Sequence, residues 1–365
     1  MGACCSSLSK KKRDKYQVNP TEFSENNPKV KEDVHVEGIV TELKHINTKN
    51  DDDKVGIDNA NNKDNNLLPS NKTNNIMFIS CGYDNFIKFW DINNENVLFS
   101  IKAHNKDINT ILQLDNNTIL SGSADYEIKK WSISEKLCLA SYTDHQNTIN
   151  CLVKISNNKI ASGSWDRTIK IWDVETDCCI NTLIGHKDSV LCLLYLEKSD
   201  FLISGGWDKL IKKWDYNKEG ESLSTFEEHG NSVTCLLDLG NNRILSGSWD
   251  CKIFIWDLSE KGKKIGELVG HTDYVRCLLK IDDLQIASGS YDNSIKIWNF
   301  RRLECILTLN GHTNYIFDLI CFNNNTLVSA SWDKTLIIWN LENGTVIKTI
   351  KAHNDKITAL IKFAN

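Results

Sequence analysis

SGSWDRTIKIWDV, at residues 162–174, places two short β-rich runs on either side of a Trp-Asp turn. A second copy, SGSWDCKIFIWDL, occupies residues 246–258. The last tryptophan of this pattern occurs seven times along the chain, at intervals of 41 or 42 residues. These residues are Trp90, Trp131, Trp172, Trp214, Trp256, Trp298 and Trp339. Short strands and turns repeated at this period predict an all-β fold made of antiparallel sheets.

Together with GHKDSVLCLL at residues 185–194, these repeats resemble the WD40 repeat. The resemblance covers about 290 residues and implies a seven-bladed β-propeller. Individual signatures vary, because Ser132 follows Trp131 and an asparagine follows both Trp298 and Trp339. The repeat length and the strand pattern survive these departures. We therefore expect residues 76–365 to form the propeller.

The first repeat lacks its inner strand, because the chain before it is of another kind. Residues 14–75 hold all three prolines and a segment rich in Asn and Asp, a composition that favours a disordered tether. After the seventh repeat the chain continues with AHNDKITALIKF, which starts like the other repeats. We predict that residues 357–363 supply the inner strand of the first blade, which leaves no open sheet edge at the ring closure. Residues 35–46 are the competing candidate for this strand.

A pattern of four residue types accompanies every repeat. A serine stands ten residues before each repeat tryptophan, and an aspartate stands six before it. In the second to seventh repeats a histidine stands 17 or 18 residues before the serine, and His353, from the far end of the chain, would serve the first repeat. The serines are Ser80, Ser121, Ser162, Ser204, Ser246, Ser288 and Ser329; the aspartates are Asp84, Asp125, Asp166, Asp208, Asp250, Asp292 and Asp333; the histidines are His353, His104, His145, His186, His229, His271 and His312. Ser, His and Asp can form a hydrolase triad. Seven symmetric copies, each with a tryptophan whose N–H needs an acceptor, favour a structural network instead.

One rim of a WD40-like propeller carries the residue that precedes each of these aspartates. Here this residue is aromatic in six repeats: Tyr83, Trp165, Trp207, Trp249, Tyr291 and Trp332, with Ala124 as the seventh. Positions three and five after each histidine share the rim. They are small or polar in the early repeats but become Tyr274 with Arg276, and Tyr315 with Phe317, in the last two.

Large aromatic residues on a rim are typical of binding hot spots. We therefore expect the rim aromatics to point into solvent and to bind a protein partner. The sharpest form of this hypothesis is the sector made of Tyr274, Arg276, Tyr291, Tyr315, Phe317 and Trp332. The alternative is that each ring packs flat on the neighbouring blade.

The composition excludes several classes of protein. The formal charge of −5 gives no basic excess for nucleic acid, and no stretch is long and apolar enough for a membrane-spanning helix. Four of the 13 cysteines, Cys151, Cys192, Cys235 and Cys277, recur at one position of the repeat and are expected to be small buried hydrophobes in a reducing compartment. We expect no enzyme activity, cofactor, metal site or small-molecule substrate, and a monomeric propeller.

The first 13 residues, MGACCSSLSKKKR, carry the features of a membrane anchor. Gly2 fits the pattern for N-myristoylation, Cys4 and Cys5 are suited to palmitoylation, and a basic cluster follows. The cluster consists of Lys10, Lys11, Lys12 and Arg13. One myristoyl chain alone binds membranes only marginally, so stable binding needs a second signal, which the two cysteines and the basic cluster would supply.

These observations predict a non-catalytic scaffold or adaptor held at the cytosolic face of a membrane. That membrane would be the plasma membrane or an inner membrane system, and an unacylated form would be cytosolic. The alternative is a soluble substrate-receptor subunit of a ubiquitin-ligase-type complex. It is disfavoured because Arg276 is the only arginine at the rim positions and no F-box-like region precedes the repeats.

Overall fold

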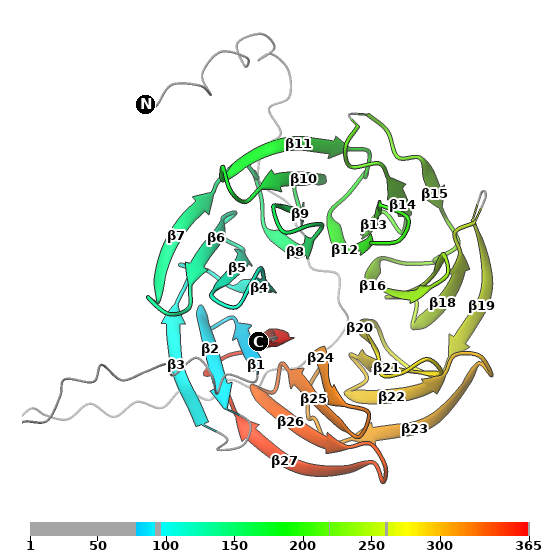
Figure 1. Ribbon diagram of the computed structural model, residues 1–365. Coiled ribbons are helices and arrows are strands. Elements are labelled where there is room, and N and C mark those ends of the chain that lie inside the picture. Colours follow the sequence, from blue (N-terminus) through cyan, green and yellow to red (C-terminus); the bar gives the residue numbers. More distant parts are fainter. Residues whose placement is uncertain (1–77, 92–95, 219, 260–261, 364–365) are drawn as a thin grey trace, which may run out of the picture. The chain divides into compact units, whose positions relative to one another are not determined.

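The computed structural model describes residues 78–91, 96–218, 220–259 and 262–363. In this part of the chain the regular elements are all strands, and they form seven antiparallel sheets of four strands each. Figure 1 shows these sheets arranged as seven blades around one axis. The expected all-β, seven-bladed propeller is confirmed. The proposed anchor (residues 1–13), the tether (residues 14–75) and the competing strand at residues 35–46 lie outside the described residues.

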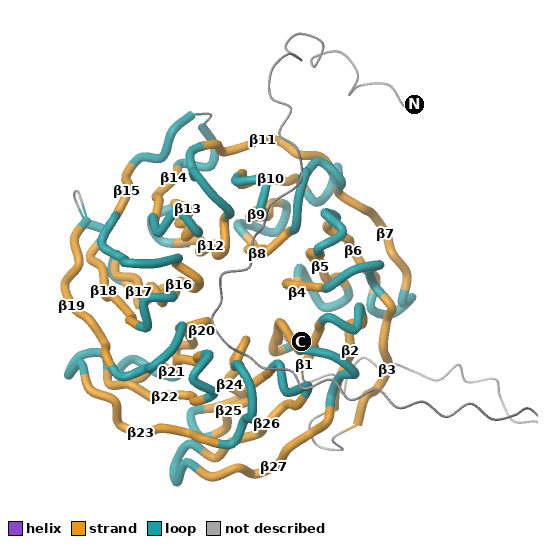
Figure 2. The backbone as a smooth tube through the Cα atoms, turned by 180° about the vertical axis from the view of Figure 1, so that it is seen from behind, coloured by secondary structure: helices purple, strands orange, loops and turns teal. Residues whose placement is uncertain are grey.

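Each blade is a meander that runs from the axis outward (Figures 1 and 2). The inner strands, from the first blade to the seventh, are β28 (Ile357–Lys362), β4 (Ile108–Gln113), β8 (Ile149–Lys154), β12 (Val190–Leu196), β16 (Val233–Gly240), β20 (Val275–Lys280) and β24 (Ile316–Asn323). The second strands are β1 (Phe78–Gly82), β5 (Thr118–Ser123), β9 (Lys159–Ser164), β13 (Phe201–Gly206), β17 (Arg243–Ser248), β21 (Gln285–Ser290) and β25 (Thr326–Ser331).

The two outer layers complete the blades. The third strands are β2 (Phe86–Asp91), β6 (Ile128–Ser132), β10 (Thr168–Asp173), β14 (Ile211–Trp214), β18 (Lys252–Asp257), β22 (Ser294–Asn299) and β26 (Thr335–Asn340). The outermost strands are β3 (Asn96–Lys102), β7 (Leu137–Tyr142), β11 (Cys178–Ile184), β15 (Ser224–Phe226), β19 (Lys263–Val269), β23 (Glu304–Asn310) and β27 (Thr345–Lys351).

The two ends of the repeat region meet inside the first blade. β28 pairs antiparallel with β1, with Phe78 opposite Lys362 and Ser80 opposite Leu360. β28 also packs against β24 of the seventh blade and β4 of the second. This is the pairing that the histidine pattern predicts for residues 357–363, and it ties β28 to β1, the last and the first strands of the described residues.

The core lies between neighbouring blades. Trp172 of the third blade, for example, packs in one cluster with Leu120, Ile128 and Tyr142 of the second. Successive side chains of a strand point to opposite faces of the sheet, so apolar residues at alternate positions lie between blades. On β10, for example, Ile169 and Ile171 are buried. Each blade therefore buries its apolar surface against its neighbours, and the ring is the smallest unit that covers all of it.

The glycine in each Ser-Gly-Ser run allows a close approach of strands. A Cβ on Gly163 would lie 2.7 Å from the sulfur of Cys151 and 2.7 Å from a methyl group of Val190 in the next blade. Cys192, Cys235 and Cys277 are buried as their recurrence predicts, whereas Cys151 is half-buried. Burial raises the pKa of Cys151 and Cys235 to about 12, so these thiols stay protonated at neutral pH.

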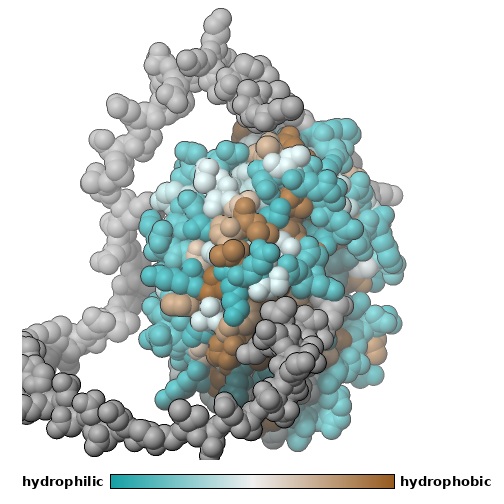
Figure 3. Space-filling view, turned by 60° about the vertical axis from the view of Figure 1, so that its left-hand side comes forward, coloured by the Kyte–Doolittle hydropathy of each residue, from teal (hydrophilic) through white to brown (hydrophobic). Residues whose placement is uncertain are grey.

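The outer strands carry exposed apolar residues on an otherwise polar surface. Leu137 and Leu139 on β7 are 60% and 50% exposed. Figure 3 shows a hydrophobic patch among hydrophilic residues on the side of the ring that it brings forward. Among the described residues, no helix meets the length and hydrophobicity that crossing a bilayer requires.

Candidate functional site

A Trp–Ser–His–Asp tetrad is present in every blade. The indole N–H of each repeat tryptophan donates to the serine Oγ at 2.7–2.9 Å. The same Oγ lies 2.6–2.7 Å from the histidine Nε2. The histidine Nδ1 lies 2.6–2.9 Å from the aspartate carboxylate. In the first blade the histidine is His353, which comes from the far end of the sequence and reaches Ser80 and Asp84.

Donor and acceptor roles within a tetrad follow from the tryptophan, which can only donate. The serine hydroxyl accepts from the indole and donates its own proton to Nε2, so Nδ1–H donates to the carboxylate. Burial acts to raise the pKa of each tetrad aspartate, but the histidine and backbone N–H groups outweigh it and hold the pKa below its usual value. For Asp125 the pKa falls to about 2.

The tetrads are structural. All seven serines are 0% exposed, so their hydroxyls cannot reach a substrate. Each histidine comes from the loop before an inner strand and each aspartate from the turn after a second strand. The tetrad therefore fixes that turn to that loop at one rim of each blade.

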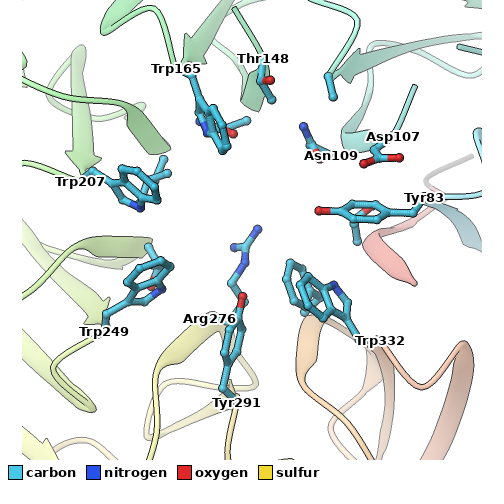
Figure 4. Close-up of a pocket in the computed structure, with 16 residues that line it drawn as sticks. Tyr83, Asp107, Asn109, Thr148, Trp165, Trp207, Trp249, Arg276, Tyr291 and Trp332 are labelled. Carbon is cyan, nitrogen blue, oxygen red and sulfur yellow. The ribbon is translucent and has the colours of Figure 1, made fainter. Parts of the chain in front are cut away.

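The residue before each tetrad aspartate is held in one orientation. Its backbone N–H donates to the carbonyl of the residue three positions after the histidine of the same blade, as Trp249 does to Ser232 and Trp332 to Tyr315, both at 3.0 Å. Figure 4 shows that these side chains converge on the axis, where they surround a cavity of about 310 Å³. We call this cavity and its wall the mouth. The six rim aromatics all line it: Tyr83, Trp165, Trp207, Trp249, Tyr291 and Trp332.

The orientation of these aromatics differs from the expectation that they point outward into solvent. Trp165 is 43% exposed, but the other five are half-buried against one another and against the next blade. Their backbone hydrogen bonds direct the side chains toward the axis. The rings consequently form the wall of a cavity.

Stacked rings link the blades around the mouth. Trp249 stacks on Tyr274 of the next blade at 4.7 Å between ring centroids, and Tyr291 stacks on Tyr315 at 4.1 Å. Packing on the neighbouring blade, the alternative raised by the sequence, therefore occurs at the same residues that line the cavity. Such contacts hold the rings rigidly, which lowers the entropy that binding would cost.

Phe317 lies deeper than its place in the predicted sector implies. It is 7% exposed and is covered by Trp332, with ring centroids 4.7 Å apart, and by the Arg276 guanidinium, 4.7 Å from its ring centroid. The predicted sector is otherwise brought together. Phe317 belongs to the floor of the mouth and offers little surface to a partner.

The opposite side of the mouth is polar. Ala124 leaves a gap in the aromatic wall, and Asp107, Asn109 and Thr148 line that side (Figure 4). Lys356, which sequence reasoning missed, places its ammonium 4.0 Å from the ring centroid of Trp332. It stands three residues after His353, so the count applied to the other histidines would have found it.

Below the mouth the inner strands line the channel with small and sulfur-containing residues. Cys151, Cys192, Cys235 and Cys277 occupy equivalent positions in four blades, and Asp318 takes this position in the seventh. Its carboxylate accepts the backbone N–H of Leu360 in β28 at 2.7 Å. In the described ranges, no group of three or more His, Cys, Asp or Glu side chains is arranged to hold a metal ion.

Seven four-stranded blades, each fixed by the same tetrad, define a β-propeller built from sequence repeats. The chain belongs to the WD40 family: the family model described as "WD domain, G-beta repeat" matches more than half of it. The matched segments are 95–132, 136–173, 177–215, 220–257, 262–299 and 303–340. These six matches leave out β28, β1 and β2 of the first blade and β27 of the seventh, which lie at the two ends of the repeat region.

The chain is also similar to solved protein structures. The computationally designed Ika8 protein is 29% identical, with a TM-score of 0.63 over 77% of this chain and 86% of that one. The WD40 β-propeller domain of Doa1 is 28% identical, with a TM-score of 0.63 over 70% of this chain and 86% of that domain. A comparison with curated proteins gave no match.

Proposed function

We propose that this protein is a non-catalytic scaffold that binds a partner protein at the aromatic sector of its mouth. WD40 propellers typically serve as protein-interaction scaffolds. The observation that carries the proposal is an aromatic wall around one cavity, which Tyr291 and Trp332 line. Tyr274 and Tyr315 lie outside the cavity lining and pack against these two rings. Rigid aromatic rings beside a pocket are typical of interface hot spots.

The dimensions of the mouth limit what enters it. A cavity of about 310 Å³ holds one or two side chains rather than a folded domain. A loop or an extended segment of the partner would place an anchor side chain in the cavity while its flanks rest on the rim. This mode uses the backbone positions that the tetrads already fix, so little reorganisation accompanies binding.

The test is quantitative co-purification from solubilised cells with the full chain. The double variant Tyr315→Ala, Trp332→Ala is expected to lose its specific partners, because Trp332 lines the mouth and the Tyr315 ring packs against it. The control is Ile347→Ala, at a 58% exposed site on outer strand β27 of the same blade. Retention of every partner by the folded double variant would contradict the proposal.

The second part of the proposal is that N-terminal acylation holds this scaffold at the cytosolic face of the plasma membrane or an inner membrane system. It rests on Gly2, Cys4, Cys5 and the basic cluster at residues 10–13. A myristoyl chain alone gives an association constant of about 10⁴ M⁻¹, so palmitate or the basic residues would supply the further affinity. Each basic residue adds about 1 kcal/mol near an anionic leaflet.

Membrane fractionation with Gly2→Ala tests this second part. The substitution removes the myristoylation site, and we expect the protein to move to the soluble fraction. Ala3→Ser is the matched control and should stay with membranes. If Gly2→Ala also stayed, the anchor would be refuted while the mouth proposal stood.

A further inference from the structure

We propose that Arg276 makes the mouth selective for a partner segment that carries a carboxylate side chain, Asp or Glu, into the cavity. This inference rests on the proposed function, because it names the chemistry of the partner at the same site.

Arg276 breaks a pattern that other blades follow. At the equivalent inner-strand position, Asn109 donates to the carbonyl of Ile149 at 2.9 Å, and Asn150 donates to that of Val190 at 2.7 Å. These bonds tie each blade to the next. Among the described residues, the Arg276 guanidinium makes no hydrogen bond or ion pair, and it lies 4.7 Å from the centroid of the Phe317 ring in a cation–π contact. Figure 4 shows the guanidinium directed into the centre of the cavity.

The same wall holds two further donors that lack an acceptor. The indole nitrogens of Trp249 and Trp332 are shielded from solvent and have no hydrogen-bond partner among the described residues. These tryptophans belong to the fifth and seventh blades, on either side of Arg276. Buried N–H groups normally have an acceptor. Both nitrogens are closed off from solvent as the rings stand, so the donor that faces the cavity without an acceptor on this side is Arg276, and a carboxylate supplies one.

The acids near Arg276 do not already satisfy it. Asp318 lies below it, but its two oxygens accept the backbone N–H groups of Leu319 and Leu360. Among the described residues no hydrogen bond or ion pair joins Asp318 to Arg276; the two interact only through their charges, since burial raises the pKa of Asp318 to about 6 and Arg276 acts against that rise. Asp107 lines the opposite side of the mouth. Arg276 is thus free to pair with an incoming group.

Charge balance favours a carboxylate over a phosphate. Arg276 lines the cavity and Asp107 lines its opposite side, so a doubly charged phosphate would meet more repulsion there than a singly charged carboxylate. An arginine fork also matches the two oxygens of a carboxylate. The aromatic rings beside it would pack on the residues that flank the acid.

The experiment uses the full chain and immobilised pools of acetylated, amidated hexapeptides that differ at one fixed central residue: Glu, Gln, phosphoserine or Lys. We expect the wild-type protein to prefer the Glu pool to the Gln pool by about tenfold, the effect of one charge-assisted hydrogen-bonded pair in a small cavity. Arg276→Gln should abolish that preference. Arg276→Lys should keep part of it, because it retains the charge but loses the fork. Arg301→Gln, at an exposed site of the same blade outside the mouth, is the control and should behave as wild type.

Each result has a definite meaning. Equal retention of the Glu and Gln pools, or an unchanged Glu preference in folded Arg276→Gln, overturns the carboxylate proposal but leaves the mouth as a binding site. Stronger retention of the phosphoserine pool overturns it in favour of phosphate. A wild-type protein that retains no pool contradicts both this inference and peptide binding at the mouth. Thermal unfolding of each variant, with midpoints within a few degrees of wild type, shows that the comparison is between folded proteins.

Discussion

Trp165 and Trp172 lie seven residues apart in the third blade and behave differently. Trp172 is 1% exposed, donates its indole N–H to Ser162 and packs against the second blade. Trp165 is 43% exposed and lines the mouth beside Trp207. Trp172 occupies a position that holds tryptophan in all seven blades, whereas the position of Trp165 varies from blade to blade. Positions that repeat hold the ring together, and positions that vary around the mouth give it a particular binding surface.

Removing the inner strand of the first blade should have the largest effect on the repeated part of the structure. A chain that ends at Asp355 lacks buried Ile357, Leu360 and Phe363 and leaves the edge of β1 unpaired. Each buried side chain contributes about 1.5–3 kcal/mol, so we expect the loss to approach the whole stability of the fold. Circular dichroism and size-exclusion chromatography would show an unfolded or aggregated protein. A chain shortened only by residues 364–365 is the control, and a monomeric, cooperatively folding chain ending at Asp355 would contradict this account of ring closure.

The two tryptophans of the third blade give the next largest contrast. Trp172→Ala should lower the free energy of unfolding by about 3–5 kcal/mol, since it opens a cavity between blades and leaves Ser162 without its donor. Trp165→Ala should change it by less than about 1 kcal/mol because the ring is partly exposed. Urea denaturation of both variants measures the difference. Similar losses would mean that the mouth is part of the core.

Breaking one tetrad at its rim should cost less than removing its tryptophan. Asp250→Ala leaves the Nδ1–H of His229 and the backbone N–H of Gly230 without an acceptor, and we expect a loss of about 1–3 kcal/mol. Asp257→Ala, at the end of β18 in the same blade, where among the described residues the carboxylate accepts only from Ser259 of the following turn, is the matched control and should cost less. Asp125→Ala in the second blade should match Asp250→Ala. A large difference between the two blades would show that the tetrads are not equivalent.

Acid should lower the free energy of unfolding in a defined pH window by protonating the tetrad aspartates. The effect per residue should be the smallest of the effects predicted here. The tetrad aspartates have a lower pKa in the folded chain than in the unfolded one, so their stabilisation is complete above about pH 4. It is lost as the pH falls through the folded values, which for Asp125 is about 2. Urea midpoints measured from pH 7 to pH 2.5 should fall slightly below about pH 6.5, because burial lowers the pKa of His353 and the unfolded chain takes up its proton first, and should fall more steeply below about pH 4. Asp250→Asn should decline less steeply, whereas midpoints that held constant to pH 2.5 would contradict the assignment.

The tetrads and the aromatic positions of the mouth could be predicted from the sequence, whereas contacts between blades could not. The tetrads follow from counting residues, because the repeat fixes where each serine, histidine and aspartate must lie. The same count indicates the aromatic positions of the mouth. It does not reveal that Phe317 is buried under Arg276, or that Lys356 lies on Trp332, because those contacts join residues of different blades. Their geometry exists only after β28 has closed the ring and brought the first and seventh blades together.

The inward direction of the rim aromatics was beyond the sequence for a related reason. The backbone bond from Trp249 to Ser232, repeated in each blade, directs the side chain toward the axis. The pattern identifies the residues but carries no information on which side of the turn their side chains occupy. The missing acceptors around Arg276 likewise became visible only when its neighbours were in place.

The most direct test of the central claim is photo-crosslinking at two sites of the sixth blade. p-Benzoyl-phenylalanine would replace Tyr291 at the mouth in one protein and Ile306, 46% exposed on the outer strand β23, in the other. The account predicts that the partner crosslinks to the probe at residue 291 and not to the probe at residue 306. A partner captured at residue 306 alone would contradict it and place the binding surface on the outer side of the blades.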